Sequence, residues 1–358
     1  MFTSSFGWGG LERNLAVMAQ WMSQAGHRVT LGAATGSPLH SHALDQGIHV
    51  STVQTQRQLS RFIQGQDVLW IRDPRDLRLA AAMSRRHQIP LVMQQAMQIS
   101  TPKFKLWHKR RFGQVHAWVS GLEWLKDQVL HNTPLTSDVC HVIPLPLDAR
   151  WFQPPRTSNH RLELRKELGL PTEAWMVGTV GRLDPGKGQA LLLEALTELP
   201  GHVHALFVGS NTVDNGRDEH QRLVDRAETL GVNDRVHWRS ETDDPLPFYD
   251  ILDAFAMTST SETIGTVTLE AMARGVPVVG SRAGGTAQLV DEGRGMPFAA
   301  GDSQALASAL MSLLKLPVSE RSAMTRLALQ WAQTSHPDHV IPAWNRILDI
   351  VVDEGRTP

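Results

Sequence analysis

The chain has 358 residues, of which 41% are hydrophobic and 20% are charged, with a formal net charge of −1. This composition is typical of globular proteins and excludes fibrous and disordered classes, while a single cysteine, Cys140, excludes an internal disulfide and indicates a reducing compartment. No apolar run reaches the roughly 18 residues of a membrane span, and the start lacks a basic and then apolar leader. We expect a cytoplasmic protein of two domains, at roughly 100–200 residues per domain.

Strand and helix patterns alternate through the first half. Apolar residues at helical spacing predict a helix over 11–26, and a first strand has only the short run 1–3 to use. Strands are further predicted at 27–31, 67–72, 89–94, 115–119 and 139–143, and helices at 75–87 and 121–131. Such alternation predicts a parallel sheet covered on both faces.

A proline-rich segment, residues 143–156, is the predicted linker between domains. The alternation then resumes, with strands predicted at 175–180, 203–208, 235–238, 253–257 and 276–279, and helices at 188–199, 217–230, 266–274, 302–314 and 319–334. A last helix, 342–353, has an apolar face that needs a surface to cover it. Two sets of βα units predict two Rossmann-like domains in an α/β protein.

The charge is divided unevenly between these halves. Residues 1–150 carry 16 Lys and Arg against 9 Asp and Glu, a net +7, and the remainder carries 19 against 27, a net −8. This asymmetry indicates different partners for the two halves, with the basic half facing an anionic acceptor, a membrane or nucleic acid. Chance variation on a solvated surface is the alternative.

A glycine-rich turn at 181–188, GRLDPGKG, follows a predicted strand and opens a predicted helix. Free amides at a helix start, together with Arg182 and Lys187, favour phosphate binding. The spacing is similar to a P-loop, but Gly188 stands where Ser or Thr would hold magnesium, which counts against a nucleoside triphosphatase. A turn without function, bearing a surface lysine, is the alternative.

A second turn from strand to helix, Gly9-Gly10-Leu11-Glu12, lies at the matching place in the first half. It lacks the glycine spacing of the dinucleotide fingerprint. On its own it indicates only a tight turn.

Two carboxylates, Glu262 and Glu270, stand on either side of a glycine turn, with seven residues between them. Glu270 lies near the start of a predicted helix, where a carboxylate is favourable for the helix dipole. One carboxylate can accept hydrogen bonds from both hydroxyls of a ribose diol, which gives such an acid a binding role. Two solvated acids are the alternative.

The segment 103–112, KFKLWHKRRF, interleaves basic and aromatic residues. Such a segment can lie on an anionic membrane surface or bind nucleic acid, and a solvated helix with a partly buried tryptophan is the alternative. The residues of this membrane or acceptor patch are Lys103, Lys105, Trp107, Lys109, Arg110 and Arg111.

Taken together, four segments resemble the family 4 glycosyltransferases, which are retaining enzymes of the GT-B fold. They are GWGGLER at 7–13, VIPLPLDARWFQP at 142–154, GTVGRLDPGKG at 178–188 and, most specifically, SETIGTVTLEAMARGVPVVGSRAGGTAQLV at 261–290. The resemblance covers most of the chain. It implies two Rossmann-like domains facing across a cleft, with residues 1–150 for the acceptor and 151–338 for a nucleotide-sugar donor, and a C-terminal helix, 339–358, that returns to the first domain.

The resemblance also implies roles for individual residues. Arg182 and Lys187 would bind the diphosphate and stabilise it as the leaving group, Glu270 would hold the ribose, and Glu262 would face the donor sugar. The other donor-binding residues that it implies are Gly9, Gly10, Gly181, Gly265, Thr266 and Val267. The implied enzyme uses no metal or other cofactor, and the sequence contains no Asp-x-Asp pair.

Arg72 departs from the family's pattern, because many relatives carry at this strand end a histidine that touches the sugar. Either Arg72 forms a salt bridge with Asp73 or Asp76, or it meets an anionic group, such as a uronic acid carboxylate on the donor or a phosphate on the acceptor.

The reaction implied is transfer of a sugar to an acceptor hydroxyl in the synthesis of a cell-surface polysaccharide or a glycolipid similar to lipopolysaccharide. The expected partners are a nucleotide sugar, a glycan or glycolipid acceptor and, at the inner face of the membrane, anionic lipid, but not nucleic acid. The alternatives are a phosphorylase or epimerase of similar fold and a non-catalytic nucleotide-sugar-binding module. The presence of all four residues Arg182, Lys187, Glu262 and Glu270 counts against such a module.

Overall fold

The computed structural model describes residues 1–153, 158–211 and 218–356. The end of the predicted linker and the first residue of the helix predicted at 217–230 lie outside these ranges. The chain divides into two compact units, of which unit 1 comprises Met1–Pro146 and Pro337–Pro358 and unit 2 comprises Leu147–His336. Each unit has parallel strands with helices around them, so the predicted α/β class with two Rossmann-like domains is confirmed.

The strands of unit 1 form a two-stranded and a four-stranded parallel sheet. Phe2 joins them through parallel bridges to Gly32 and Ile71, so the expected short first strand is reduced to one bridging residue. The strands are β1 (Leu31–Ala33), β2 (Val50–Thr52), β3 (Leu69–Ile71), β4 (Leu91–Gln94), β5 (Val115–Ser120) and β6 (Cys140–Val142), and β3 to β6 are neighbours in that order.

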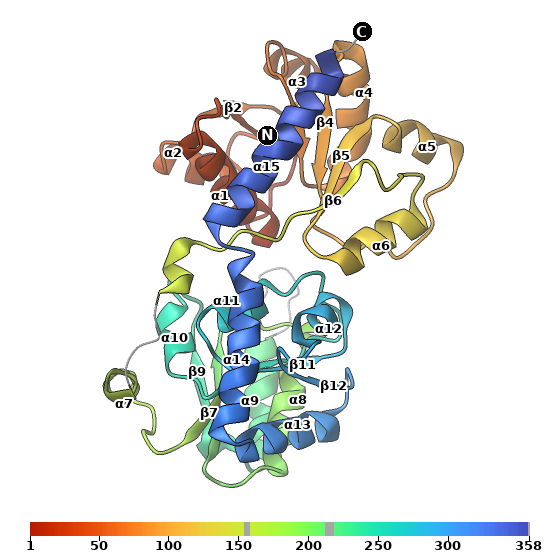
Figure 1. Cartoon of the computed structure of the whole chain (residues 1–358). Helices are drawn as coiled ribbons and strands as arrows, with labels where there is room; N and C mark the ends of the chain where they lie inside the picture. The colour runs from red at the N-terminus through yellow and green to blue at the C-terminus, as the bar shows by residue number, and fades with distance from the viewer. Residues whose placement is uncertain (154–157, 212–217, 357–358) are drawn as a thin grey trace. The chain divides into compact units, whose positions relative to one another are not determined.

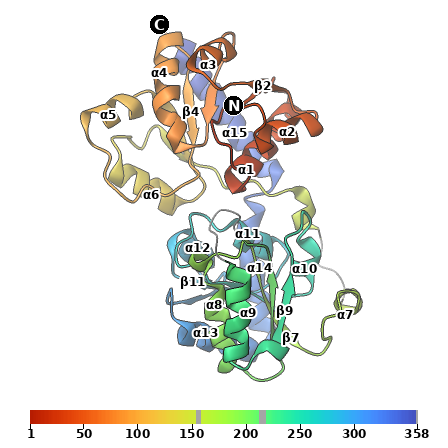
Figure 2. The ribbon, with the colours of Figure 1, turned by 180° about the vertical axis from the view of Figure 1, so that it is seen from behind.

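Helices cover both faces of the larger sheet of unit 1 (Figures 1 and 2). Apolar residues of α1 and α15 pack on one face, where Trp344 stacks on Trp70 with ring centroids 3.9 Å apart, and residues of α3 to α6 pack on the other. The helices are α1 (Gly10–Gln24), α2 (Pro38–Asp45), α3 (Gln56–Phe62), η1 (Pro74–Asp76), α4 (Leu77–His87), α5 (Leu106–Phe112), α6 (Glu123–Asn132) and α15 (Pro337–Arg356). The predicted return of the last helix to the first domain is confirmed.

Unit 2 is built on a six-stranded parallel sheet with the order β12-β11-β10-β7-β8-β9. Its strands are β7 (Trp175–Val180), β8 (Val203–Val208), β9 (Val236–Arg239), β10 (Ala254–Met257), β11 (Val278–Ser281) and β12 (Met296–Phe298). The near-continuous apolar runs of the central strands fit a sheet that is buried on both faces. The register pairs β7 with β8 along the whole length of both strands.

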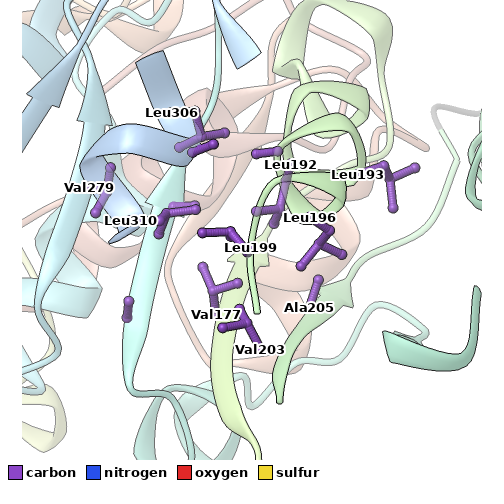
Figure 3. Packing of buried hydrophobic residues seen from close by; sticks show 14 of the residues in the cluster. Val177, Leu192, Leu193, Leu196, Leu199, Val203, Ala205, Val279, Leu306 and Leu310 are labelled. Carbon is purple, nitrogen blue, oxygen red and sulfur yellow. The ribbon is translucent and has the colours of Figure 1, made fainter. Parts of the chain in front are cut away.

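The helices of unit 2 pack against this sheet around a leucine-rich core. Figure 3 shows leucines of α8 and α13, among them Leu192 and Leu310, lying over β7 and β11. The helices are η2 (Ala149–Phe152), α7 (Ser158–Glu167), η3 (Pro185–Lys187), α8 (Gln189–Thr197), α9 (Glu219–Thr229), η4 (Asn233–Arg235), α10 (Leu246–Asp250), α11 (Thr266–Ala273), α12 (Gly284–Val290), α13 (Ser303–Lys315) and α14 (Val318–Gln333).

One predicted strand is misplaced. Residues 27–31 were expected to form a strand, but β1 begins only at Leu31, because its pairing with β2 starts there. Short elements, including α2, α3, α10, α12, β2 and β12, have no counterpart among the predicted segments. Among the helices of the described residues, none is both long and apolar enough to span a membrane.

Candidate active site

The predicted donor residues, apart from Gly9 and Gly10, gather where the strand order of unit 2 reverses. From β7 the sheet continues to β8 and β9 on one side and to β10, β11 and β12 on the other. In open parallel sheets, ligands bind outside the carboxyl ends of the strands at such a switch point. The segments 181–188, after β7, and 258–265, after β10, lie at this place because β7 and β10 are neighbours.

Hydrogen bonds join these two segments. The Thr258 hydroxyl donates to the carbonyl of Lys187 at 2.8 Å, and the Thr260 amide donates to the carbonyl of Gly186 at 3.2 Å. Gly188 has φ +66°, and a Cβ atom there would overlap the carbonyl oxygen of Thr258. Only glycine fits this position, so the backbone holds the loop of Lys187 against the loop of Glu262.

Lys187 and Glu262 form an ion pair. The distance from Nζ of Lys187 to Oε2 of Glu262 is 2.8 Å, and the two side chains are 33% and 15% exposed. The Glu262 carbonyl also accepts from the amide of Gly285, at the start of α12, at 2.9 Å. Arg182 precedes Lys187 by five residues and is exposed. Two cations, Arg182 and Lys187, therefore share this edge of the sheet with two carboxylates, those of Glu262 and Asp184.

The first turn of α11 lies at the same edge. Gly265 caps the helix with φ +84°, a left-handed conformation that favours glycine. The amides of the first helical residues, which include Thr266 and Val267, have no partner within the helix, and they form its positive end. The geometry therefore adds backbone donors to the cations of the adjacent loop, and such an arrangement binds anions.

Glu270 lies one turn further along α11 in a different environment. The hydroxyl of Tyr249, on α10, donates to Oε2 of Glu270 at 2.7 Å. Burial raises the pKa of Glu270 to about 7, although the Tyr249 hydrogen bond and the charge of Arg150 both oppose the shift. Burial, together with the charge of Glu270, also raises the pKa of Tyr249, so that the phenol stays a neutral donor. Tyr249 thus holds one carboxylate oxygen of Glu270, Oε2.

Sequence reasoning missed Tyr249 and Thr258. Tyr249 is the chain's single tyrosine and is 0% exposed. A signal was present, because a buried tyrosine needs a partner for its hydroxyl, but the sequence does not show that this partner is Glu270. Thr258 gave no signal, since its role depends on a contact between two loops that are 71 residues apart.

The turn at Gly9 and Gly10 belongs to unit 1 and caps α1. The Gly9 amide donates to Oε2 of Glu12 at 2.9 Å, and the Ser5 hydroxyl donates to Oε1 at 2.5 Å. Glu12 is 5% exposed. Part of this turn's donor capacity is therefore used within unit 1.

Arg72 follows β3 and is buried, and the first of its two alternatives, a salt bridge with Asp73 or Asp76, is not formed among the described residues. Asp73 pairs with Arg75 at 2.5 Å, and Asp76 accepts from the Ser4 hydroxyl at 2.5 Å. Both acids are held by other residues because the chain turns into η1 directly after Arg72. Burial lowers the pKa of Arg72 to about 9, and the charge of Glu12 opposes this shift.

The basic and aromatic patch around α5 is on the surface of unit 1. Leu106 is 81% exposed, Trp107 is 51% exposed, and Phe104 and Met97 are similarly open. The ammonium of Lys105 lies 5.0 Å from the centre of the Trp107 ring. The other basic residues of the patch are Lys103, Lys109, Arg110 and Arg111. Trp107 is thus about half buried on an exposed helix, which agrees with the alternative of a solvated helix and leaves the membrane contact a prediction.

Two Rossmann-like units, with a C-terminal helix packed on the first and the loops after β7 and β10 at the switch point of the second, are typical of the GT-B glycosyltransferase fold. Residues 160–331 match the family described as "Glycosyl transferases group 1". This stretch, which holds Arg182, Lys187, Glu262 and Glu270, is similar to glycosyltransferases of group 1, and membership of the retaining family 4 stays a prediction.

Known proteins are similar to this domain in sequence and to the chain in fold. The chain is 34% identical over 171 residues to the lipopolysaccharide core biosynthesis glycosyltransferase LpsE of Rhizobium meliloti, a match that covers 48% of this chain and 47% of LpsE. It is 34% identical over 185 residues to a D-inositol 3-phosphate glycosyltransferase of Corynebacterium urealyticum, which covers 50% and 43%. The chain thus spans about half the length of the curated relatives it matches. The structure of Anabaena Alr3699/HepE with UDP has a TM-score of 0.87 at 22% identity and covers 97% of this chain and 98% of HepE.

Proposed function

We propose that the protein is a retaining, metal-independent glycosyltransferase that moves a sugar from a nucleotide-sugar donor to an acceptor hydroxyl. One observation carries the proposal: two cations, the start of a helix and two carboxylates in unlike environments meet at the switch point of unit 2. These groups match a nucleoside diphosphate, whose phosphates need positive charge and whose ribose offers a diol to Glu270.

The chemistry follows from the charge that develops when the glycosidic bond breaks. The bond between the anomeric carbon and the phosphate oxygen breaks, and its electron pair leaves with the diphosphate. Arg182 and Lys187 stabilise this leaving group, which is the largest catalytic contribution that fixed charges can make. The acceptor oxygen bonds to the anomeric carbon on the same face, and its proton passes to the leaving phosphate. No side chain is needed as a nucleophile.

The ion pair between Lys187 and Glu262 compensates both charges while the site holds no ligand. Without a ligand, Glu262 offsets the charge of Lys187 at 2.8 Å. When a diphosphate binds, Lys187 gains a stronger anionic partner, and Glu262 becomes available to hydroxyls of the donor sugar. A charge-assisted hydrogen bond of this kind is about twice as strong as a neutral one.

The family and the names of similar proteins narrow the donor and the pathway in this proposal. HepE was solved with UDP-glucose as well as with UDP, and LpsE acts in lipopolysaccharide core biosynthesis. We therefore expect a UDP-sugar donor and an acceptor in cell-envelope polysaccharide or glycolipid synthesis.

The test is binding, followed by transfer. UDP-glucose should raise the melting temperature of the full chain, and a ligand present at 100 times its Kd stabilises a protein by about 2.7 kcal/mol. Glu270→Gln should lose this shift, while Glu320→Gln, which changes an exposed acid in the first turn of α14, should keep it. If UDP-glucose, GDP-mannose and UDP all left the melting temperature unchanged, the proposal would fail.

The second step, an assay of sugar transfer, distinguishes the transferase from the alternative functions. A transferase releases UDP faster when its acceptor is supplied, for example as envelope lipid extract. A phosphorylase would need inorganic phosphate in place of an acceptor, an epimerase would change the sugar without releasing the nucleotide, and a non-catalytic module would bind without turnover.

We further propose that the patch around α5 contacts anionic membrane lipid, so that the enzyme works at the inner face of the membrane. The exposed Leu106 and Trp107 supply apolar area, and the basic residues supply attraction to negative headgroups. Both contributions together are the usual requirement for interfacial binding.

Vesicle flotation tests the membrane contact. The wild type should float with phosphatidylglycerol vesicles at low salt but not with neutral vesicles. A variant with Trp107→Ala, Lys109→Gln and Arg110→Gln should stay at the bottom. A control with Arg85→Gln and Arg86→Gln loses two charges from α4 and should still float; equal loss in the control would reduce the effect to net charge.

A further inference from the structure

Arg72 is a buried cation whose bonding capacity is mostly unused. The residue is 3% exposed, and among the described residues its guanidinium donates one hydrogen bond, from Nη1 to the side-chain oxygen of Asn14 on α1. Its Nε has no partner in this part of the chain. A guanidinium carries five N–H donors, and a buried charge is tolerated only when it is paired and hydrogen-bonded.

The neighbouring carboxylates do not supply that pairing. Arg75 holds Asp73, Ser4 holds Asp76, and Glu12 caps the start of α1. Glu12 acts on Arg72 through its electric field, without a hydrogen bond between them. The positive charge of Arg72 is therefore offset only at a distance.

A second unsatisfied polar group lies at the same edge of the sheet. Gln94 ends β4, and its side-chain oxygen is buried without a partner among the described residues. Strands β3 and β4 are parallel neighbours in which Ile71 pairs with Met93, so Arg72 and Gln94 come next in register. Because side chains alternate between the faces of a sheet, Arg72 and Gln94 share the face that α1 covers, as the bond to Asn14 shows.

We propose that Arg72 and Gln94 form an anion-binding subsite in unit 1, which accepts a carboxylate or phosphate of the acceptor. The guanidinium would pair with the anionic oxygens, and the Gln94 oxygen would accept from an adjacent hydroxyl. The ligand class is a hydroxylated compound with one anionic group, such as an acidic sugar or a phosphorylated polyol. The slight exposure of Arg72 limits the contact to that one functional group.

The proposal rests on the proposed function only for the statement that the anion belongs to the acceptor. Anion binding can be measured without any donor. Thermal shift with potassium phosphate and with potassium glucuronate, at fixed ionic strength and in the full chain with Lys187→Gln to weaken the proposed phosphate site of unit 2, should show stabilisation, whereas glucose should give none. Arg72→Gln should weaken the apparent affinity for both anions at least tenfold.

Arg78→Gln is the matched control. It removes an exposed cation six residues away, on α4. It should leave both anion responses within twofold of those of the Lys187→Gln chain. If Arg72→Gln and the control responded alike, or if the Lys187→Gln chain bound neither anion, the subsite would not exist.

Gln94→Glu, in the same Lys187→Gln chain, tests the site without removing Arg72, in case the loss of that residue prevents folding. The new carboxylate would be nearly the same shape as the amide and would pair with the guanidinium. This variant should have a higher melting temperature than the Lys187→Gln chain without anions and should lose the response to phosphate. A variant that kept the full phosphate response would contradict the proposal.

The source of the anion is settled by comparing donors. If the proposed function fails, UDP-glucose will not bind although phosphate still does, and the two ideas are thereby separated. A preference for UDP-glucuronate over UDP-glucose that disappears in Arg72→Gln would place the anion on the donor and overturn the assignment to the acceptor. Equal binding of both donors in the wild type and in Arg72→Gln supports it.

Discussion

Glu262 and Glu270 are the same residue type at the two ends of one short segment, yet their surroundings are opposite. Glu262 lies in a loop, where Lys187 pairs with it at 2.8 Å. Glu270 lies on α11, where its hydrogen-bond partner is the neutral hydroxyl of Tyr249 and burial raises its pKa to about 7. The comparison teaches that the end of the site proposed to bind phosphate, here called the phosphate end, is organised by charge, while the end proposed to bind ribose, the ribose end, is organised by burial and hydrogen bonding.

The sharpest test of this division is to remove charge from the phosphate end alone. Arg182→Gln and Lys187→Gln should each lower kcat about a hundredfold or more, which is the scale observed when one donor to a developing anion is lost. Both should also weaken UDP binding but leave uridine binding unchanged. Calorimetry with UDP and uridine measures this, with Lys315→Gln on α13 as control. Equal losses for uridine would mean that the two ends are not separate.

Gly188→Ala should damage the phosphate end through the backbone. The substitution forces a left-handed φ on a residue with Cβ and pushes that atom into the Thr258 carbonyl. We expect the free energy of unfolding to fall by about 3 kcal/mol in urea denaturation. Gly301→Ala has a similar φ of +80° but open space around it, and it should cost only about 1 kcal/mol. Similar costs at both positions would remove the argument that the two loops are locked together.

Burial of Glu270 at the ribose end should make the free energy of unfolding depend on pH. The pKa of Glu270 is about 7 in the folded protein, above its ordinary 4.5, so the native state binds more protons than the unfolded state between these values. The free energy of unfolding should therefore fall by roughly 2 kcal/mol as pH rises from 4.5 to 7. Glu270→Gln should lack this component when melting temperatures at pH 5 and pH 8 are compared.

Binding of a diol should show the reverse dependence on pH. The ionised carboxylate is the better acceptor, so the affinity for both uridine and UDP should rise through pH 7 in the wild type. A flat profile in the wild type would show that Glu270 does not titrate in the site.

The sequence indicated the local structure of segment 181–188 better than the surroundings of Glu270 or of Arg72. Segment 181–188 could be recognised because glycines, a helix start and two cations are adjacent in the chain. The partner of Glu270 could not, because Tyr249 precedes it by 21 residues and only the folded sheet brings α10 and α11 together. In the same way, the salt bridge considered for Arg72 is not formed with Asp73, because Arg75, two residues after Asp73, reaches that acid first.

Of the substitutions proposed here, Tyr249→Phe should have the smallest effect. It should change ligand affinity and not turnover. Loss of the hydroxyl leaves Glu270 without its donor, and a hydrogen bond to a charged group contributes about 1.5–3 kcal/mol, of which water that enters the space restores part. We expect uridine and UDP affinities to fall three- to tenfold, with kcat at saturating donor unchanged.

The pH profile separates positioning from packing at this residue. The Tyr249 hydrogen bond lowers the pKa of Glu270, so its removal should move the midpoint of uridine binding to higher pH. Trp151→Phe changes the ring that packs edge-on against Tyr249, with centroids 5.4 Å apart, and should lower the melting temperature without moving that midpoint. If both variants moved it equally, Tyr249 would act only by filling space, and the contrast between the two carboxylates would rest on burial alone.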